Sequence, residues 1–208
     1  LIISGSGKYF CIGMDIDFLG SCFADPTHTF SGFVTRYHEL LHRIEEANIP
    51  IIAAVNGIAR AGGIELLLAC DLVVMSSEAK IGDHHLASGI PPGAGAGVRL
   101  QRILGPIRAR EFIFSARWMN ADEAFQSGVA SHVCAPDQIE VIIDQIVDNL
   151  SRTSRTALAA TKSALLQASP TRPGCKAELK VFLDFVTNDP DASEGYRAWV
   201  EKRSPQWK

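Results

Sequence analysis

The stretch IIAAVNGIARAGGIELLLACDLVV, residues 51–74, decides the fold of this chain. It contains an apolar strand at 51–57 that stops at Asn-Gly, then a glycine turn, a short helix and a second apolar strand at 72–77. Alternating strands and helices are typical of the α/β class. One carboxylate, Glu65, stands inside the otherwise apolar helix, three residues after Gly62. A helix that only fills a core gains nothing from this carboxylate.

Two interpretations of Glu65 stay open from this segment alone. The first N–H groups of a helix have no partner within the helix and lie at the positive end of its dipole. A carbonyl oxygen that gains negative charge is stabilised there, and the glycines let it approach the backbone. Burial among leucines raises the pKa of Glu65 and the helix end lowers it, which suits a general acid or base. Alternatively, Glu65 only complements the helix dipole.

A second glycine turn favours the catalytic interpretation. In GKYFCIGMD, residues 7–15, Gly13 precedes a possible short helix, so the N–H of Met14 is a second candidate donor. Two N–H donors that meet at one oxygen form an oxyanion hole, whereas a single N–H donor at a turn does not indicate one. We therefore expect Met14 and Gly62 to converge on one site.

The rest of the chain divides into an α/β part and a helical part. Strands are also expected at 1–4 and 129–135, an irregular segment at 17–28, and a long Gly/Pro-rich loop at 79–97. Helical periodicity and end signals predict helices at about 33–47, 97–104, 106–115, 120–127, 137–150, 154–168, 176–188 and 191–203. We therefore expect an α/β core over residues 1–135 and a helical region over 136–208.

Composition excludes several classes. The chain has 208 residues, 47% of them hydrophobic, and a net charge of −3, so no broad basic field recruits nucleic acid or an anionic membrane. No apolar stretch approaches the ~20 residues that span a bilayer. Five cysteines without a CxxC pair argue against disulfides or a structural zinc, and we expect no metal. We therefore expect the protein in a reducing compartment. The cytoplasm is the first expectation, and mitochondria and peroxisomes are alternatives.

Several segments together resemble the crotonase (enoyl-CoA hydratase/isomerase) family. GKYFCIGMD resembles the family's first oxyanion segment, and IPIIAAVNGIARAGGIELLLACDLVV resembles its second. GPIRAREFIFSARWMNADEAFQSGVASHV and EGYRAWVEKRSPQWK match its later helices and C-terminal end. The resemblance implies a spiral of ββα units, a C-terminal helical trimerisation region, and assembly as a homotrimer or hexamer. It also implies that the first strands of the spiral are absent, consistent with the abrupt start at LIIS.

The resemblance implies roles for individual residues. Met14 and Gly62 would supply the two amides that polarise a thioester carbonyl, and Glu65 matches the first of the hydratases' two catalytic glutamates. At the position of the second glutamate stands His85, which departs from the pattern. A Glu–His pair can still activate water, because imidazole titrates near neutral pH. Asp83 is expected either to orient His85 or to act in its place.

The loop HLASGIPPGAG, residues 85–95, also resembles that of the family's β-diketone hydrolases, which use a His in the loop and a later Asp. The Asp position is Ala94 here, so their His–Asp pair is not expected. His84 and His85 would face opposite ways in an extended loop, so only one is expected to enter the site.

Substrate binding is expected from three further positions. Gly93 would allow close approach of an acyl chain. By resemblance, Phe182 lies near a position that packs on the adenine of CoA, and Lys202 matches a cation that reaches its phosphates.

We therefore expect an enzyme of the lyase type that stabilises the enolate of an acyl-CoA thioester and adds water to a 2-enoyl-CoA, as in fatty acid metabolism. CoA would be part of the substrate, with no separate cofactor. A double-bond isomerase, a β-diketone C–C hydrolase and a non-catalytic crotonase-fold binding protein remain alternatives. Some relatives bind RNA, but the acidic net charge and the retained Glu65 favour catalysis without nucleic acid.

Overall fold

The computed structural model describes residues 1–208 and contains two four-stranded sheets. Sheet A is parallel throughout and has the spatial order β1 (Ile2–Ser4), β3 (Ile52–Val55), β5 (Leu72–Ser76), β8 (His132–Cys134). Sheet B has the order β2 (Tyr9–Cys11), β4 (Ile58–Arg60), β6 (Lys80–Gly82), β7 (Met119–Asn120), and only its β6–β7 pair is antiparallel.

The first six strands alternate between the two sheets. Each pair β1–β2, β3–β4 and β5–β6 places one strand in sheet A and the next in sheet B, and a helix follows each pair. The first α-helix after each pair is α1 (Ile16–Ala24), α3 (Gly62–Ala69) and α4 (Ala96–Leu104), respectively. The α/β fold with a spiral of ββα units is therefore confirmed.

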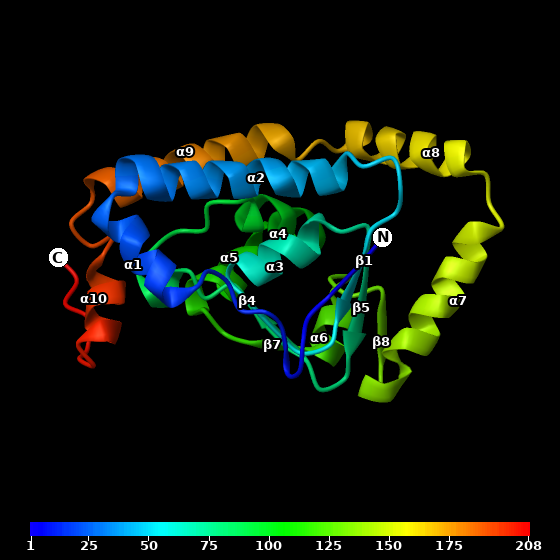
Figure 1. Cartoon of the computed structure of the whole chain (residues 1–208), viewed down its shortest axis with the longest axis horizontal. Coiled ribbons are helices and arrows are strands. Elements are labelled where there is room, and N and C mark those ends of the chain that lie inside the picture. Colours follow the sequence, from blue (N-terminus) through cyan, green and yellow to red (C-terminus); the bar gives the residue numbers. More distant parts are fainter.

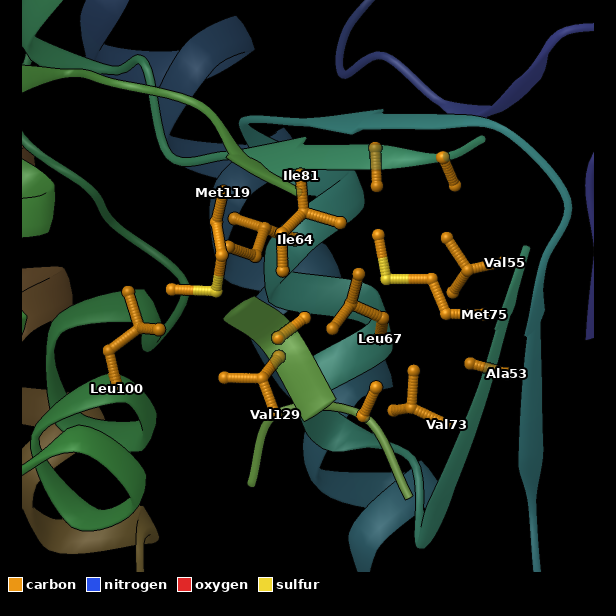
Figure 2. Packing of buried hydrophobic residues seen from close by; sticks show 14 of the residues in the cluster. Ala53, Val55, Ile64, Leu67, Val73, Met75, Ile81, Leu100, Met119 and Val129 are labelled. Carbon is orange, nitrogen blue, oxygen red and sulfur yellow. The ribbon is translucent and has the colours of Figure 1, made fainter. Parts of the chain in front are cut away.

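Helix α3 packs against the facing apolar sides of both sheets. Ile64 and Leu67 of this helix are fully buried, and they lie among side chains from sheet A, such as Met75, and from sheet B, such as Ile81 (Figure 2). Burial of one large apolar side chain contributes about 1.5–3 kcal/mol. Packing on both sides therefore holds the N-terminus of α3, and with it the Gly-Gly turn, in one place.

Gly63 allows α3 to approach strand β2 closely. A Cβ atom built on Gly63 would overlap the carbonyl oxygen of Cys11. The second glycine of the pair is therefore required by packing, and it brings the start of α3 next to the Gly13 turn.

The remaining helices cover the sheets and form the C-terminal part. They are α2 (Ser31–Glu45), α5 (Pro106–Ser115), α6 (Ala121–Gln126), α7 (Ile139–Ser151), α8 (Arg155–Ala168), α9 (Arg172–Asn188) and α10 (Glu194–Val200). Short helical turns lie at Pro26–Phe30, Leu86–Ser88 and Pro136–Gln138. Helices α2 and α9 run side by side along one face, although they are far apart in sequence (Figure 1). None of the helices is long and apolar enough to cross a membrane.

Two sequence predictions were wrong in detail. The segment 17–28, expected to be irregular, contains most of α1, because the Asp15 carboxylate accepts hydrogen bonds from the N–H groups of Asp17 and Phe18 and caps the helix. The strands of sheet B were not expected: β2 and β6 fall in predicted loops, and β4 in the predicted turn. The division at residue 135 stays a prediction.

Candidate active site

A cavity of about 230 Å³ lies beside the N-terminus of α3. One part of its wall is polar and contains Met14, Gly62, Glu65 and His85. Another part is apolar and aromatic, with side chains from the first helices and from α9. The cavity thus joins backbone donors, two ionisable groups and an apolar wall, as enzyme pockets commonly do.

The two residues expected to supply the amide donors, Met14 and Gly62, line the same cavity. A Cβ atom built on Gly13 would lie 3.7 Å from the Gly62 nitrogen, so the turn before Met14 lies against the start of α3. The N–H of Met14 makes no hydrogen bond within the protein. Gly62 is the first residue of α3, so its N–H has no acceptor within the helix. Both donors are thus available to a bound oxygen.

The backbone around Gly62 is held by unusual contacts. Ala61, the residue before α3, has φ +50° and ψ −119°, a conformation that favours glycine. The Tyr37 hydroxyl of α2 donates to the Gly62 carbonyl at 2.5 Å. Burial, together with the charge of Glu65, raises the pKa of Tyr37, so its hydroxyl remains a donor. Tyr37 was not expected at the site, because its contact with Gly62 joins two segments that are distant in the sequence.

Glu65 is buried, with 3% of its surface exposed, and faces the cavity. Its Oε1 accepts the N–H of Ala94 at 2.8 Å, while Oε2 has no partner in the protein. Burial raises its pKa, and the positive charge of His85 partly opposes that rise. One carboxylate oxygen is therefore fixed and the other is free to exchange a proton.

His85 is oriented by Asp83. Its Nδ1 lies 3.0 Å from Oδ2 of Asp83, which is fully buried. Burial by itself lowers the pKa of His85, but the carboxylates of Asp83, Glu65 and Glu178 together raise it to about 9. His85 is therefore protonated at neutral pH, with Nδ1 committed to Asp83.

The peptide group between Ala94 and Gly95 is held at both ends. Arg99 Nη1 donates to the Ala94 carbonyl at 2.7 Å, and the Gly95 N–H donates to Glu178 Oε1 of α9 at 2.7 Å. Arg99 also forms a bidentate ion pair with Glu45 of α2, at 3.0 Å for both contacts. Since the Ala94 N–H also donates to Glu65, these contacts fix the position of the Glu65 carboxylate. None of these three charged residues was expected at the site from the sequence.

Comparison with known proteins decides the family. A family profile described as "Enoyl-CoA hydratase/isomerase" matches residues 1–208. Crotonyl-CoA hydratase of Syntrophomonas wolfei is 35% identical over 98% of this chain and 78% of the relative's length. The chain belongs to the enoyl-CoA hydratase/isomerase family. The 2,3-dehydroadipyl-CoA hydratase of Escherichia coli K12 is 34% identical over 100% of this chain and 80% of its own length.

Solved structures of this family share the fold. A crystal structure of an enoyl-CoA hydratase from Mycobacterium avium subsp. paratuberculosis K-10 matches with a TM-score of 0.84 and 26% identity, over 100% of this chain and 79% of that one. An enoyl-CoA hydratase from Bacillus anthracis matches with a TM-score of 0.76 and 31% identity, over 100% and 80% of the two chains. The resemblance inferred from sequence is therefore confirmed.

The structure brings most of the residues expected from the enoyl-CoA hydratase/isomerase pattern to the cavity. Gly93 and Phe182 line it, in addition to the polar wall. Lys202 is exposed beyond α10 and is not part of the lining. His84 turns away from His85, and its ring packs 4.1 Å from that of Trp118. The expectation that only one of the two histidines enters the site is met.

The two expectations about Asp partners of His85 have separate outcomes. The position where the diketone hydrolases carry their later Asp is Ala94, so their His–Asp pair is not reproduced. Asp83 orients His85, which is one of the two roles expected for it: the His85 N–H also donates to Asp83 Oδ1 at 3.3 Å.

Proposed function

We propose that this protein hydrates a 2-enoyl thioester of coenzyme A. The observation that carries the proposal is the placement of four groups on one cavity: the amides of Met14 and Gly62, the carboxylate of Glu65 and the imidazolium of His85. Amides aimed at one oxygen stabilise the enolate that forms when a nucleophile adds to a conjugated thioester. Because the amides are held by the backbone, little reorganisation accompanies the reaction.

Glu65 acts as the base in the proposed reaction. Its free Oε2 accepts a proton from water while the water oxygen bonds to the β-carbon of the substrate. The electron pair of the double bond moves toward the thioester, and the carbonyl oxygen becomes anionic between the Met14 and Gly62 amides. The neighbouring charge of His85 favours the ionised form of Glu65 that this step needs.

His85 acts as the acid. Its Nε2 has no partner in the protein, and a pKa of about 9 keeps the ring protonated at neutral pH. It donates a proton to the α-carbon of the enolate, so that one H and one OH have been added across the double bond. After product release, the proton gained by Glu65 returns through solvent to His85. Glu65 and His85 thus take the places of the two glutamates. The ionised carboxylate is the base and the protonated imidazole is the acid.

A hydration assay tests this proposal. With crotonyl-CoA, the loss of absorbance of the conjugated thioester reports turnover. Glu65→Gln and His85→Gln are each expected to lower kcat by about 10²- to 10⁴-fold. The matched control is His132→Gln, a change at an exposed histidine on β8, and it is expected to keep wild-type turnover. Wild-type rates in both site variants would refute the assigned roles.

The Asp83–His85 pair favours a second candidate, hydrolytic cleavage of a β-diketone. A histidine oriented by a carboxylate activates water in its neutral form, which His85 reaches as the pH rises through about 9. The same amides would stabilise the enolate that leaves. A chain that cleaves a cyclic 1,3-diketone, but does not hydrate crotonyl-CoA, would support this function over the first.

We also propose that the protein works as a homotrimer or hexamer in the cytoplasm. Large apolar side chains are exposed on α5 and α6, namely Ile107, Phe114 and Phe125. Exposed apolar groups of this size are commonly covered by partner subunits. Sedimentation equilibrium that returns a monomer mass would refute the assembly.

A further inference from the structure

Arg60 is the only lysine or arginine that lines the cavity. It is the last residue of β4, and the preceding Ala59 is fully buried in the core. Because successive side chains of a strand point to opposite faces, Arg60 points away from the core and toward the cavity. The cavity thus contains a permanent cation that the proposed hydration chemistry does not use.

The guanidinium of Arg60 has few partners. Its Nε is buried and makes no hydrogen bond, and its single side-chain hydrogen bond runs from Nη2 to the Ser88 hydroxyl at 3.2 Å. No carboxylate lies within ion-pair distance of it, whereas Arg99 is paired with Glu45. A part-buried guanidinium has five N–H donors and no means of losing its charge, so unpaired donors are unfavourable. A ligand with anionic oxygens would complete this site.

The position of Arg60 indicates which part of the ligand carries that charge. Arg60 precedes Gly62 by two residues, so their backbones are at most about 7 Å apart. A carboxylate a few methylenes from the thioester carbonyl falls within this range. The phosphates of CoA lie beyond the whole pantetheine arm. A guanidinium also matches a carboxylate in bidentate geometry.

We propose that Arg60 binds an anionic oxygen group of the substrate, and that this group is a carboxylate on the acyl chain. The proposal rests on the proposed function, since it assumes that an acyl-CoA occupies the cavity. It makes the preferred substrate class the enoyl-CoA thioesters of dicarboxylic acids, with Arg60 as the residue that selects them.

Binding of unreactive ligands tests the inference separately from catalysis. Adipyl-CoA and hexanoyl-CoA both have six-carbon acyl chains. The chain ends in a carboxylate in adipyl-CoA and in a methyl group in hexanoyl-CoA. Calorimetry would give the dissociation constants of both for wild type, Arg60→Met and Arg60→Lys. The control is Arg110→Met, which removes an exposed arginine of α5 that does not line the cavity. Hexanoyl-pantetheine, which has no phosphates, is the third ligand.

We expect wild type to prefer adipyl-CoA by about tenfold or more, the usual strength of a hydrogen bond to a charged group. Arg60→Met should abolish that preference, Arg60→Lys should retain part of it, and Arg110→Met should keep it. Equal binding of both CoA thioesters by wild type would overturn the inference and leave the proposed function intact. If wild type binds neither thioester, the proposed function fails and the inference fails with it.

The third ligand identifies the source of the charge. If Arg60→Met weakens both CoA thioesters equally but not hexanoyl-pantetheine, the anion is a CoA phosphate and the assignment to the acyl carboxylate is overturned. Equal loss for all three ligands would show general damage to the cavity, and would overturn the inference as well.

Discussion

The imidazole Nδ1 of His85 lies 3.0 Å from the carboxylate of Asp83, and both side chains are buried beside the cavity. The pair converts a histidine, which ordinarily titrates near neutral pH, into a group that keeps its proton up to about pH 9. In the proposed hydration this proton goes to the α-carbon. If His85 is the acid, its contact with Asp83 sets the upper pH limit of the proposed activity.

Asp83→Asn is expected to narrow that range from the alkaline side. Since the active His85 is protonated, kcat of the wild type should fall as pH rises through about 9. Without the Asp83 carboxylate the pKa of His85 falls, and the alkaline loss of kcat should move down by about one to three pH units. The pH profile of crotonyl-CoA hydration measures this. Asp122→Asn, at an exposed position of α6, is the control; an unmoved profile in Asp83→Asn would contradict the assignment.

Glu45 is expected to contribute to acid unfolding. Burial would raise its pKa, but hydrogen bonds from His42, Arg99 and Thr171 lower it to about 2, against an ordinary 4.5. A folded-state pKa below the unfolded value gives stability that is complete above pH 4.5 and is lost as pH falls toward 2.

Glu45→Gln should therefore be less stable at pH 7 by about 3 kcal/mol, because Arg99 loses its buried partner. Its free energy of unfolding should also change less between pH 4.5 and 2 than that of wild type. Urea denaturation at a series of pH values measures both quantities. The control is Glu39→Gln, a half-exposed glutamate of the same helix, and the prediction fails if the two variants behave alike.

Ala61→Gly is expected to stabilise the fold by about 1 kcal/mol. Ala61 has φ +50°, where a side chain is strained and glycine is not. The opposite change in stability is expected for Ala59→Gly, two residues earlier in β4, where a fully buried methyl group would be lost. Chemical denaturation compares the two. A loss of stability in Ala61→Gly would show that the strain is absent.

Gly63→Ala should damage both stability and activity. The added methyl group would overlap the Cys11 carbonyl, so α3 and β2 must separate. We expect a loss of about 2 kcal/mol or more and a large fall in crotonyl-CoA turnover, because the Met14 and Gly62 amides no longer meet. Gly32→Ala, in α2, meets only the flexible end of Arg36 at 3.4 Å and should be tolerated. Normal turnover in Gly63→Ala would argue against the two-amide site.

The sequence predicted the strands of sheet A and most helices within a few residues. The strands β3 and β5 are apolar runs, buried on both faces, and such runs are recognisable without their partners. Helices such as α5 carry their own periodicity and end signals. The strands of sheet B are three residues or fewer, and β2, β4 and β6 contain or lie near glycines. No local sequence pattern identifies these strands, because they are defined by hydrogen bonds to neighbouring strands from other parts of the chain.

The candidate site shows the same division. Glu65, Met14, Gly62 and His85 were expected from short motifs, and all four line the cavity. Asp83, two residues from His85, was expected as its partner, but the other groups that hold the site were not, because their contacts join distant segments. Tyr37 binds Gly62 across 25 residues, and Glu178 binds Gly95 across 83.

By itself, the sequence determined that this is an α/β chain with two glycine turns after apolar strands and one carboxylate in a buried helix. Hydrophobic periodicity, turn residues and helix-end signals are local properties, because residues close together in the sequence determine them. Only the tertiary structure decided that the two turns meet, that Asp83 orients His85 and that Arg60 faces the cavity without a counter-ion. These depend on the packing of α3 between two sheets, which no single segment encodes.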